Sequence, residues 1–422
     1  MQSSFLFDPY HPLSRSKIEG AVSGALDALG AREKKSILLI PPDFTRYHSM
    51  AGEICQMIYK MLPSSCRVDL LPAVGTHMAL DREEREKMFG DIPAERFLPH
   101  DWRSDTISLG TVPREEVERA SGGKFGEEIE VEVNRRLIDG GYDLILSVGQ
   151  VVPHEIVGMA NYSKNIFVGV GGRQMINKSH MVSALAGVEN VLGVTDSPAR
   201  QIFDYAQKHY LDRLGIVYFL TVTKMSGGKN GMHGLFTGTT REPFEAAAKL
   251  SQELNITYVD KPTKKVVALM DEFEFKSVWV ANKGIYRTCL TIADGGELIL
   301  LAPGVAAFGE NPEADGLIRK FGYKGADYIM GHYRKGDFGD YFMVAAHILQ
   351  GCANGRFKIT YATDPAKLSK VEVEGVGYAH LDIGEARTLY DPARLAEGWN
   401  TLPSGEEVYF VRNPALGLWK LR

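Results

Sequence analysis

Cysteine is scarce in this chain: there are four among 422 residues, at positions 55, 66, 289 and 352, and none form a Cys-x-x-Cys pair. This spacing argues against a disulfide framework and a thiolate zinc site, and fits a reducing compartment. No run approaches eighteen apolar residues, and residues 1–17 lack the charged start and apolar run of a signal peptide. The net charge of -5 does not indicate the basic surface that is typical of nucleic-acid-binding proteins. We therefore expect a cytoplasmic protein with no membrane or nucleic-acid partner.

Helix-like and strand-like segments alternate along the chain, which is typical of an α/β fold. The length of 422 residues favours two domains. We predict an N-terminal domain over 1–265, which carries the chemically distinctive motifs, and a smaller C-terminal α/β domain over 266–422. Each is expected to hold a mainly parallel sheet flanked by helices, with the active site in the cleft between the domains. The chain end is expected to pack back on the first domain.

Short apolar runs bounded by breakers predict buried parallel strands. In the first domain the expected strands are 37–40, 68–77, 143–154, 165–172 and 215–223, and helices are expected at 15–34 and 51–63. In the second domain the strand-like segments are KKVVALMDEF, SVWVAN, ELILLAPG, RFKITYAT and EVYFVR. The segment 272–280 (EFEFKSVWV) also has the period-2 character of a strand.

Chemically reactive side chains follow several of these predicted strands. Pro42-Asp43-Phe44-Thr45-Arg46 comes after the first run, Gly75-Thr76-His77 ends the second, and Pro153-His154 ends the third. The fourth segment runs from Ser163 to His180 and contains Lys164. Because ligands bind beyond the carboxyl ends of strands in open α/β sheets, we expect these residues to converge on one site.

Each segment also has an ordinary structural interpretation. Asp43 and Arg46 could form a local ion pair at a helix start, since Asp favours that position. A lone histidine at a strand end is more often satisfied by a backbone hydrogen bond, and a lone lysine in a loop is usually solvated. Gly169-Val170-Gly171-Gly172 lacks the full spacing of a dinucleotide fingerprint. Only the convergence of all the segments favours a reactive site.

Taken together, these motifs resemble the nickel-pincer-nucleotide lactate racemase family and its 2-hydroxyacid racemase and epimerase relatives. The Asp-Phe-Thr-Arg segment resembles the family's cofactor and substrate loop, and Gly-Thr-His and Pro-His resemble its two catalytic-histidine loops. The family places its cofactor-bearing lysine ten residues after the second catalytic histidine, and its nickel-ligand histidine sixteen residues later. The positions of His154, Lys164 and His180 keep both spacings.

The resemblance implies a role for each residue. Lys164 would bear, through an amide-type link, the nickel(II) complex of pyridinium-3,5-bisthiocarboxylate mononucleotide, which the host's cofactor-biosynthesis enzymes would have to supply. His180 would complete the nickel coordination beside the Lys164 attachment, because soft sulfur donors with one imidazole suit square-planar nickel. Asp43, Phe44, Thr45 and Arg46 would contact the cofactor, and Arg46 would also hold the substrate carboxylate with its guanidinium fork.

The implied reaction is inversion of C2 of a small 2-hydroxy acid. The Cα hydrogen leaves as hydride to the cofactor while a base takes the hydroxyl proton, and hydride returns to the opposite face. Such a reaction needs a base for each face, and His77 and His154 are suited to the task. Two alternatives stay open: a zinc-dependent hydrolase or lyase that uses the same histidines, and a ligand-binding homologue without turnover.

The substrate is expected to differ from lactate. Lactate racemases resemble one another in a later Tyr-Gln-x-x-Lys motif, whose nearest segment here is Tyr286-Arg287-Thr288-Cys289-Leu290. Arg287 adds a cation where an amide would stand, and Lys283 or Arg287 could replace the lost lysine. We therefore expect Lys283, Tyr286 and Arg287 to bind a dicarboxylic hydroxy acid or an aldonate. An ion pair with a purely structural role is the other interpretation of Arg287.

Overall fold

The computed structural model describes residues 2–226, 229–339, 341–415 and 417–422, and it divides into two compact units. Unit 1 comprises Met1–Ala186 with Asn190–Asn255, and unit 2 comprises Gly187–Glu189 with Ile256–Arg422. The division falls at Asn255 and Ile256, whereas we expected it after residue 265. Among the described residues, no helix combines the length and apolar character needed to cross a membrane.

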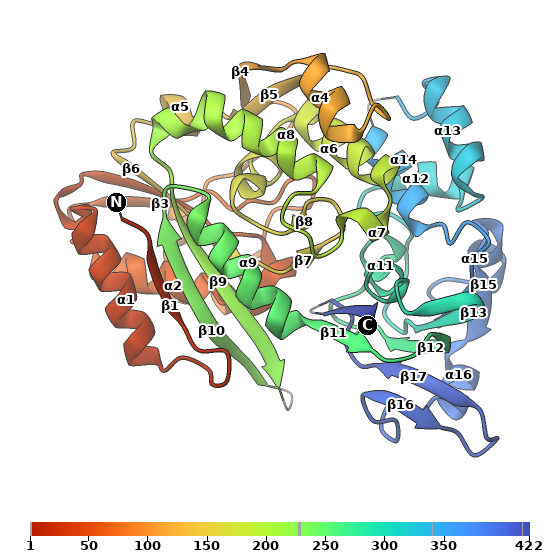
Figure 1. Cartoon of the computed structure of the whole chain (residues 1–422). Helices are drawn as coiled ribbons and strands as arrows, with labels where there is room; N and C mark the ends of the chain where they lie inside the picture. The colour runs from red at the N-terminus through yellow and green to blue at the C-terminus, as the bar shows by residue number, and fades with distance from the viewer. Residues whose placement is uncertain (1, 227–228, 340, 416) are drawn as a thin grey trace. The chain divides into compact units, whose positions relative to one another are not determined.

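Unit 1 is built on a six-stranded sheet of order β1-β10-β9-β6-β2-β3 (Figure 1). Its strands are β1 (Ser4–Phe7), β10 (Lys229–Gly238), β9 (Val217–Ser226), β6 (Leu144–Gln150), β2 (Ser36–Ile40) and β3 (Arg67–Leu70). The four strands β9, β6, β2 and β3 run parallel, while β10 runs antiparallel to both of its neighbours, β9 and β1. Two small antiparallel pairs are β4 (Thr106–Val112) with β5 (Ile129–Asn134), and β7 (Pro153–His154) with β8 (Gly158–Met159).

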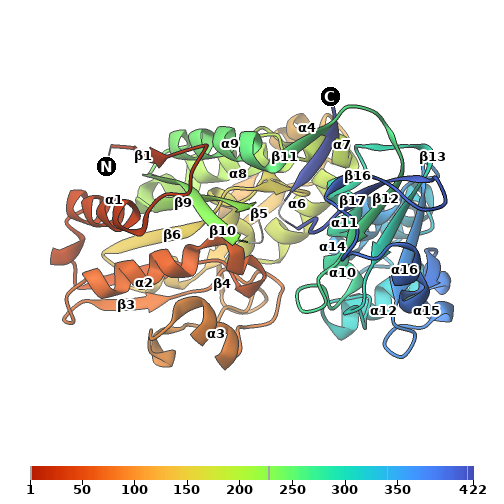
Figure 2. The ribbon, with the colours of Figure 1, turned by 90° about the horizontal axis from the view of Figure 1, so that it is seen from below.

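Helices cover both faces of this sheet, with α1 and α2 on one side and α9 on the other (Figure 2). The α-helices of unit 1 are α1 (Arg15–Ala28), α2 (Ala51–Met61), α3 (Arg82–Phe89), α4 (Arg114–Ser121), α5 (Arg136–Asp139), α6 (Arg173–Ala186), α8 (Pro198–Ala206) and α9 (Glu242–Asn255), and α7 (Val188–Val191) spans the boundary of the two units. Short helices of other types are η1 (Ala31–Glu33), η2 (Phe44–Ser49), η3 (Ala94–Arg96), η4 (Asn165–Gly169), η5 (Gln207–Leu211) and η6 (Asp212–Leu214).

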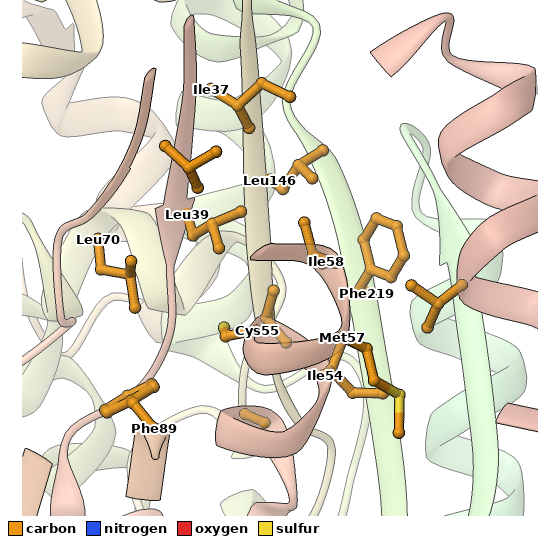
Figure 3. Close-up of a cluster of buried hydrophobic side chains, with 14 of the residues drawn as sticks. Ile37, Leu39, Ile54, Cys55, Met57, Ile58, Leu70, Phe89, Leu146 and Phe219 are labelled. Atoms are coloured by element: carbon orange, nitrogen blue, oxygen red, sulfur yellow. The ribbon is translucent and has the colours of Figure 1, made fainter. Parts of the chain in front are cut away.

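The core of unit 1 lies between α2 and the sheet. All of β2 is buried, as expected for a strand covered on both faces. Figure 3 shows the side chains that meet there: Ile54, Cys55, Met57 and Ile58 of α2, with Ile37, Leu39, Leu70, Leu146 and Phe219 of the strands. Each fully buried Leu or Ile contributes ~1.5–3 kcal/mol, so this packing holds the strand ends in place.

Unit 2 has its own six-stranded sheet of order β15-β14-β13-β12-β17-β16, which is parallel except for β16. Its strands are β12 (Thr263–Leu269), β13 (Ile292–Leu301), β14 (Lys358–Thr363), β15 (Ala379–Asp382), β16 (Gly398–Thr401) and β17 (Glu407–Val411). The helices are α10 (Val278–Ala281), α11 (Lys283–Thr288), α12 (Pro312–Phe321), α13 (Ala326–Arg334), α14 (Phe342–Gly351), α15 (Lys370–Gly375) and α16 (Ile383–Leu389). Near the chain end, β18 (Leu418–Leu421) pairs in parallel with β11 (Ile256–Val259) inside unit 2.

Three of the predicted strand segments are wrong. Residues 165–169 of the first form the π-helix η4, and residues 278–281 within SVWVAN form the helix α10, so the period-2 strand predicted over 272–280 does not form either. Short apolar runs do not distinguish a strand from a buried helix, so tertiary packing decides between them. At α10 the Ser277 hydroxyl accepts a hydrogen bond from the Val280 amide and caps the helix, a local signal that favours helix.

Candidate active site

The segments that follow β2, β3 and β6 lie together because these three parallel strands are neighbours in the sheet. The Ala73 amide donates to the Pro41 carbonyl at 2.7 Å, which joins the loop after β3 to the loop after β2. The loops after β2 and β3 therefore meet at the carboxyl ends of their strands, as expected. We call Asp43, Arg46, His77, His154, Lys164 and His180 the strand-end site.

Asp43 and His77 form the closest polar contact of the strand-end site. The Nδ1 atom of His77 lies 2.6 Å from Oδ2 of Asp43, and the Thr45 hydroxyl donates to Oδ1 at 2.6 Å. Burial alone would raise the pKa of Asp43, but the charge of His77 and these hydrogen bonds outweigh it and lower that pKa to about 2. Because Asp43 is ionised, Nδ1 of His77 must carry a hydrogen. In its neutral form His77 then keeps its lone pair on Nε2, the state of a general base.

The loop that carries His77 is held by a left-handed glycine and by η4. Gly75 has φ of +58°, and its amide donates to the Gly169 carbonyl at 2.8 Å. A Cβ at position 75 would lie 3.3 Å from the Val168 carbonyl oxygen, and an L-residue would be strained there. This glycine thus lets the loop approach the segment that follows Lys164.

His154 has a different environment, in the hairpin of β7 and β8. Its side chain is buried, and the Ile156 amide donates to its Nδ1 at 3.0 Å. A neutral His154 therefore carries its hydrogen on Nε2, the reverse of His77. The Glu155 carboxylate lies 3.8 Å from Nδ1. The two histidines are consequently set in opposite tautomers.

Lys164 is half-buried immediately before η4. The neighbouring Asn165 fixes this helix to the sheet, because its amide nitrogen donates to the Ile40 carbonyl at 2.9 Å and to the Ser147 hydroxyl at 3.0 Å. Burial, followed by the charge of Arg46, lowers the pKa of Lys164 to about 8. The amine is therefore partly neutral near physiological pH and able to act as a nucleophile.

Sequence reasoning did not single out Arg200, which supports the loop before Lys164. Its fully buried guanidinium donates to the Ser163 hydroxyl at 2.9 Å and to the carbonyls of Met159 and Asn161 at 2.7 and 3.1 Å. Asn161 and Tyr162 have φ of +66° and +56°, strained values for residues with side chains. The hydrogen bonds from Arg200 offset this strain. Only its position after the helix start Ser197-Pro198 is visible in the sequence, and that gives no hint of this role.

His180 lies on α6, and its Nδ1 is 2.6 Å from the Ile176 carbonyl. Since a carbonyl only accepts, Nδ1 carries the hydrogen and Nε2 holds the lone pair. Burial lowers the pKa of His180 to about 4; the hydrogen bond to Ile176 opposes this shift, and the positive charge of Lys164 adds to it. His180 is thus a neutral imidazole near Lys164, in the form that binds metals.

The η2 turn carries the other residues predicted to bind the cofactor. It is held by hydroxyl groups of β9, since Thr221 donates to the Ser49 carbonyl at 2.7 Å and Thr223 donates to the His48 carbonyl at 3.1 Å. Arg46 breaks the helical geometry of this turn, with φ of -112° and ψ of 28°. Phe44 packs against the hydrophobic core of unit 1 and thereby anchors the turn, and its contact with a cofactor stays a prediction.

The remaining predicted residues belong to unit 2. Tyr286 and Arg287 lie on α11 and are buried, whereas Lys283 at the start of that helix is half-buried, with its Nζ 5.9 Å from the centre of the Phe275 ring. The Tyr286 hydroxyl lies 3.1 Å from Nδ1 of His347. As substrate-binding residues, all three stay predictions.

The histidines do not form a zinc centre by themselves. Across residues 2–226, 229–339, 341–415 and 417–422, no group of three or more His, Cys, Asp or Glu side chains could hold a metal ion. A bare zinc ion on His77, His154 and His180 therefore does not fit this arrangement. A metal that brings most of its own donor atoms needs only one imidazole, and Nε2 of His180 fits that requirement.

Comparison with known proteins agrees with this arrangement. Residues 21–192 match the family model described as the lactate racemase N-terminal domain, which includes every residue of the strand-end site. A lactate racemase of Thermoanaerobacterium thermosaccharolyticum is 25% identical over 280 residues, which is 64% of this chain. The match spans 61% of the length of that relative.

Solved structures extend the likeness over both units. The crystal structure of a protein from Thermotoga maritima has a TM-score of 0.85 and 25% identity, and the match covers 99% of this chain and 100% of that one. The lactate racemase apoprotein from Thermoanaerobacterium thermosaccharolyticum has the same fold, with a TM-score of 0.69, 19% identity and coverage of 96% and 93%. Residues 21–192 are thus similar to the lactate racemase N-terminal domain, and the chain shares the fold of the lactate racemase apoprotein.

Proposed function

We propose that this protein is a racemase or epimerase that inverts C2 of a 2-hydroxy acid. The observation that carries the proposal is the pair of Lys164, immediately before η4, and His180, whose Nδ1 is bound to the Ile176 carbonyl so that Nε2 holds the lone pair. Their pKa values of about 8 and about 4 leave Lys164 partly neutral as a nucleophile and His180 neutral as a metal ligand. The curated relative named lactate racemase supports the reaction class.

In this proposal Lys164 would hold a nickel-containing pyridinium nucleotide through an amide-type link, and Nε2 of His180 would be a ligand of the metal. A bound cofactor of this kind supplies the acceptor and donor of hydride at C2. The lowered pKa of Lys164 supports the attachment, because only the neutral amine can be acylated. The hydrogen bond from His180 to Ile176 supports the coordination, because it turns Nε2 away from the backbone.

The two histidines would handle the hydroxyl proton. Nε2 of His77 accepts this proton from one enantiomer, and the ionised Asp43 stabilises the imidazolium that results. His154 serves the other face of the substrate. In neutral His154 the Nε2 atom already carries the hydrogen. Before Nε2 can accept a proton, His154 must lose the hydrogen bond that the Ile156 amide donates to Nδ1, so His77 is the base that needs no such change.

Arg46 would bind the substrate carboxylate. It carries a permanent charge beside Asp43 and Lys164, and the pKa values of both respond to it. Lys283, Tyr286 and Arg287 are proposed to contact the remainder of the substrate. The additional cation at Arg287 supports a dicarboxylic hydroxy acid or an aldonate rather than lactate.

The test is production of the protein together with the cofactor-biosynthesis enzymes, followed by intact-mass measurement and metal analysis. We expect an adduct of nucleotide size with about one nickel per chain, absent from Lys164→Ala and present in Lys178→Ala, a control lysine on α6. Loaded protein should interconvert the enantiomers of at least one acid in a chiral panel of lactate, malate and aldonates. A Lys164→Ala variant that keeps the adduct, or no turnover of any acid by loaded protein, would refute the proposal.

A further inference from the structure

A short backbone segment of unit 1 joins the two residues that are proposed to hold the cofactor. Residues 170–174 lead from the end of η4, which follows Lys164, to the start of α6, which carries His180. We call residues 170–174 the connecting segment. β5 packs beside α6 (Figure 1), and the Gly172 amide donates to the Glu132 carbonyl of β5 at 3.2 Å. The positions of Lys164 and His180 therefore depend on how neighbouring residues hold this segment.

The connecting segment is packed too closely for side chains at its two glycines. A Cβ at Gly171 would collide with the Phe167 carbonyl oxygen, and a Cβ at Gly172 would lie 2.5 Å from Cβ of Glu132. These close approaches give a structural reason for two glycines of the Gly-Val-Gly-Gly motif, which is not a dinucleotide fingerprint. Because glycine has no side chain to anchor the backbone, hydrogen bonds to its carbonyl and amide groups determine where the segment lies.

His100 reaches the connecting segment from the loop between η3 and β4. Its Nε2 lies 3.2 Å from the Gly171 carbonyl oxygen, and its Nδ1 lies 3.0 Å from the side-chain nitrogen of Asn134. The side-chain oxygen of Asn134 accepts a hydrogen bond from the Arg136 backbone amide at 3.0 Å, so the nitrogen is the atom that faces His100. An amide nitrogen only donates and a carbonyl only accepts. Both neighbours therefore require the same tautomer of His100, with the lone pair on Nδ1 and the hydrogen on Nε2.

The surroundings of His100 also favour the neutral ring. Burial lowers the pKa of His100, and the charge of Arg136 adds to this shift. The hydrogen bond at Nε2 and the charges of Asp105 and Asp101 oppose the shift but do not outweigh it. A second proton, on Nδ1, would face the side-chain nitrogen of Asn134, which cannot accept it. His100 is thus an uncharged donor with its hydrogen directed at the connecting segment.

We propose that His100 is a positioning residue that holds the connecting segment through the Gly171 carbonyl and so keeps Lys164 and His180 in place for the cofactor. The Gly171 carbonyl lies between these two residues in the chain, so a shift of the segment would move one of them relative to the other. The inference rests on the proposed function for the presence of the cofactor. It rests on the hydrogen bonds of His100 alone for the hold on the segment.

The first experiment observes the tautomer in protein without cofactor. In protein labelled with ¹⁵N at histidine, the NMR signals of His100 are assigned by their loss in His100→Gln. We expect the hydrogen on Nε2 and the lone pair on Nδ1 at pH 7. A neutral ring with its hydrogen on Nδ1 would overturn the inference, because Nε2 could not then donate to Gly171.

The second experiment compares two variants that differ in the donor they keep, again without cofactor. In His100→Gln the amide nitrogen is as many bonds from Cα as Nε2, so it can still donate to Gly171, whereas the side chain in His100→Asn is too short. We expect the amides of the connecting segment to exchange hydrogen about fivefold faster in His100→Asn, which is about the contribution of one neutral hydrogen bond. In His100→Gln the exchange should stay within about twofold of the wild type.

A matched control separates this hold from a general loss of stability. His233 also donates to a backbone carbonyl in unit 1, that of Asp8, with Nδ1 2.8 Å from the oxygen. His233→Gln removes that donor and should leave exchange in the connecting segment unchanged. Equal exchange in His100→Gln and His100→Asn, or an equal acceleration in His233→Gln, would overturn the inference.

The third experiment tests the link to the cofactor. Protein produced together with the cofactor-biosynthesis enzymes is incubated with EDTA, and the nickel that stays with the chain is measured over time. Nickel should be lost about fivefold faster from His100→Asn, and at the wild-type rate from His100→Gln and His233→Gln. Equal rates in all four proteins would overturn the inference. A wild type that takes up no nickel would contradict the proposed function alone, since the tautomer and the exchange rates still decide whether His100 holds the segment.

Discussion

The molecule contains two groups of buried polar residues that differ in charge. In the strand-end site of unit 1 the side chains are ionisable: hydrogen bonds and the charge of His77 lower the pKa of Asp43 to about 2, while burial and neighbouring charge lower the pKa of Lys164 to about 8 and that of His180 to about 4. In unit 2 the buried side chains of Asn282, Tyr286, Tyr323, His347, Tyr361 and Tyr378 form a tyrosine–histidine cluster, in which burial raises the pKa values of Tyr323, Tyr361 and Tyr378. The first group is suited to exchanging protons and binding a metal. The second holds hydrogen bonds in fixed directions.

The difference teaches that burial alone does not mark a reactive site. Burial disfavours charge in both places, but only the strand-end site adds charges of both signs close together. Substitutions in unit 1 should therefore affect chemistry most, and those in unit 2 should affect binding or stability. The predictions below test this contrast.

The largest effect is expected for the proton-transfer residues. His77→Gln and His154→Gln should each lower kcat by ~10²–10⁴-fold in cofactor-loaded protein, because a positioned acid or base contributes that much. The measurement is racemisation followed by chiral chromatography. The exposed His209 is the control, and His209→Gln should leave kcat unchanged. Equal losses in all three variants would show that the strand-end site has no special role.

A second effect concerns the support of Lys164. Arg200→Lys removes at least one of the three hydrogen bonds that the guanidinium donates. We expect the free energy of unfolding to fall by ~1.5–3 kcal/mol, because a buried hydrogen bond from a charged group contributes about that much. Urea denaturation measures this loss. Arg213→Lys, at an exposed position nearby in the chain, should stay within ~0.5 kcal/mol of the wild type. If both variants are equally stable, the strained residues before Lys164 do not depend on Arg200.

The pH dependence of stability tests the Asp43–His77 pair. The pKa of Asp43 is lowered from 3.8 to about 2 in the folded protein, so its contribution is fully present above pH ~4 and is lost as the pH falls toward 2. The shift corresponds to roughly 2 kcal/mol. Asp43→Asn should lose about this much near pH 7, and its difference from the wild type should shrink below pH 4. Asp91→Asn, at an exposed position, should show no such pH-dependent difference.

The smallest effect is expected in unit 2 away from the cluster. The Tyr390 hydroxyl lies 3.4 Å from Nζ of Lys265, a long contact at the edge of a hydrophobic core. Tyr390→Phe should change the free energy of unfolding by less than ~1 kcal/mol and leave KM unchanged. A loss of stability as large as that of Arg200→Lys, or a rise in KM, would contradict this prediction.

Much of the fold was predictable because its signals are local. The apolar run at 37–40 followed by two prolines predicts a buried strand, and β2 spans Ser36–Ile40. The runs before His77 and His154 likewise contain β3 and β6, although both strands end earlier than predicted. The run at 165–172 predicted a strand, but Asn165–Gly169 form a π-helix, whose first residue is hydrogen-bonded to the Ile40 carbonyl of the sheet.

The candidate site was predictable in its members but not in its contacts. The resemblance of the His154, Lys164 and His180 spacing to the lactate racemase family predicted three residues, and the strand ends pointed to Asp43 and His77; their roles stay predictions. Nothing local indicates that Arg200 would reach the carbonyls of Met159 and Asn161, about forty positions earlier in the chain. Nor does the sequence around His347 show that two tyrosine hydroxyls and one amide lie within hydrogen-bond distance of its ring.

By itself, the sequence determined the α/β pattern, the reactive side chains and their order, because periodicity and spacing are properties of the chain. Only the tertiary structure decided which nitrogen of each histidine holds the hydrogen and which charges lie close enough to shift the pKa of Lys164. The physical reason is that hydrogen bonds and electrostatic interactions act over a few ångströms in space, between residues that the chain separates by tens of positions.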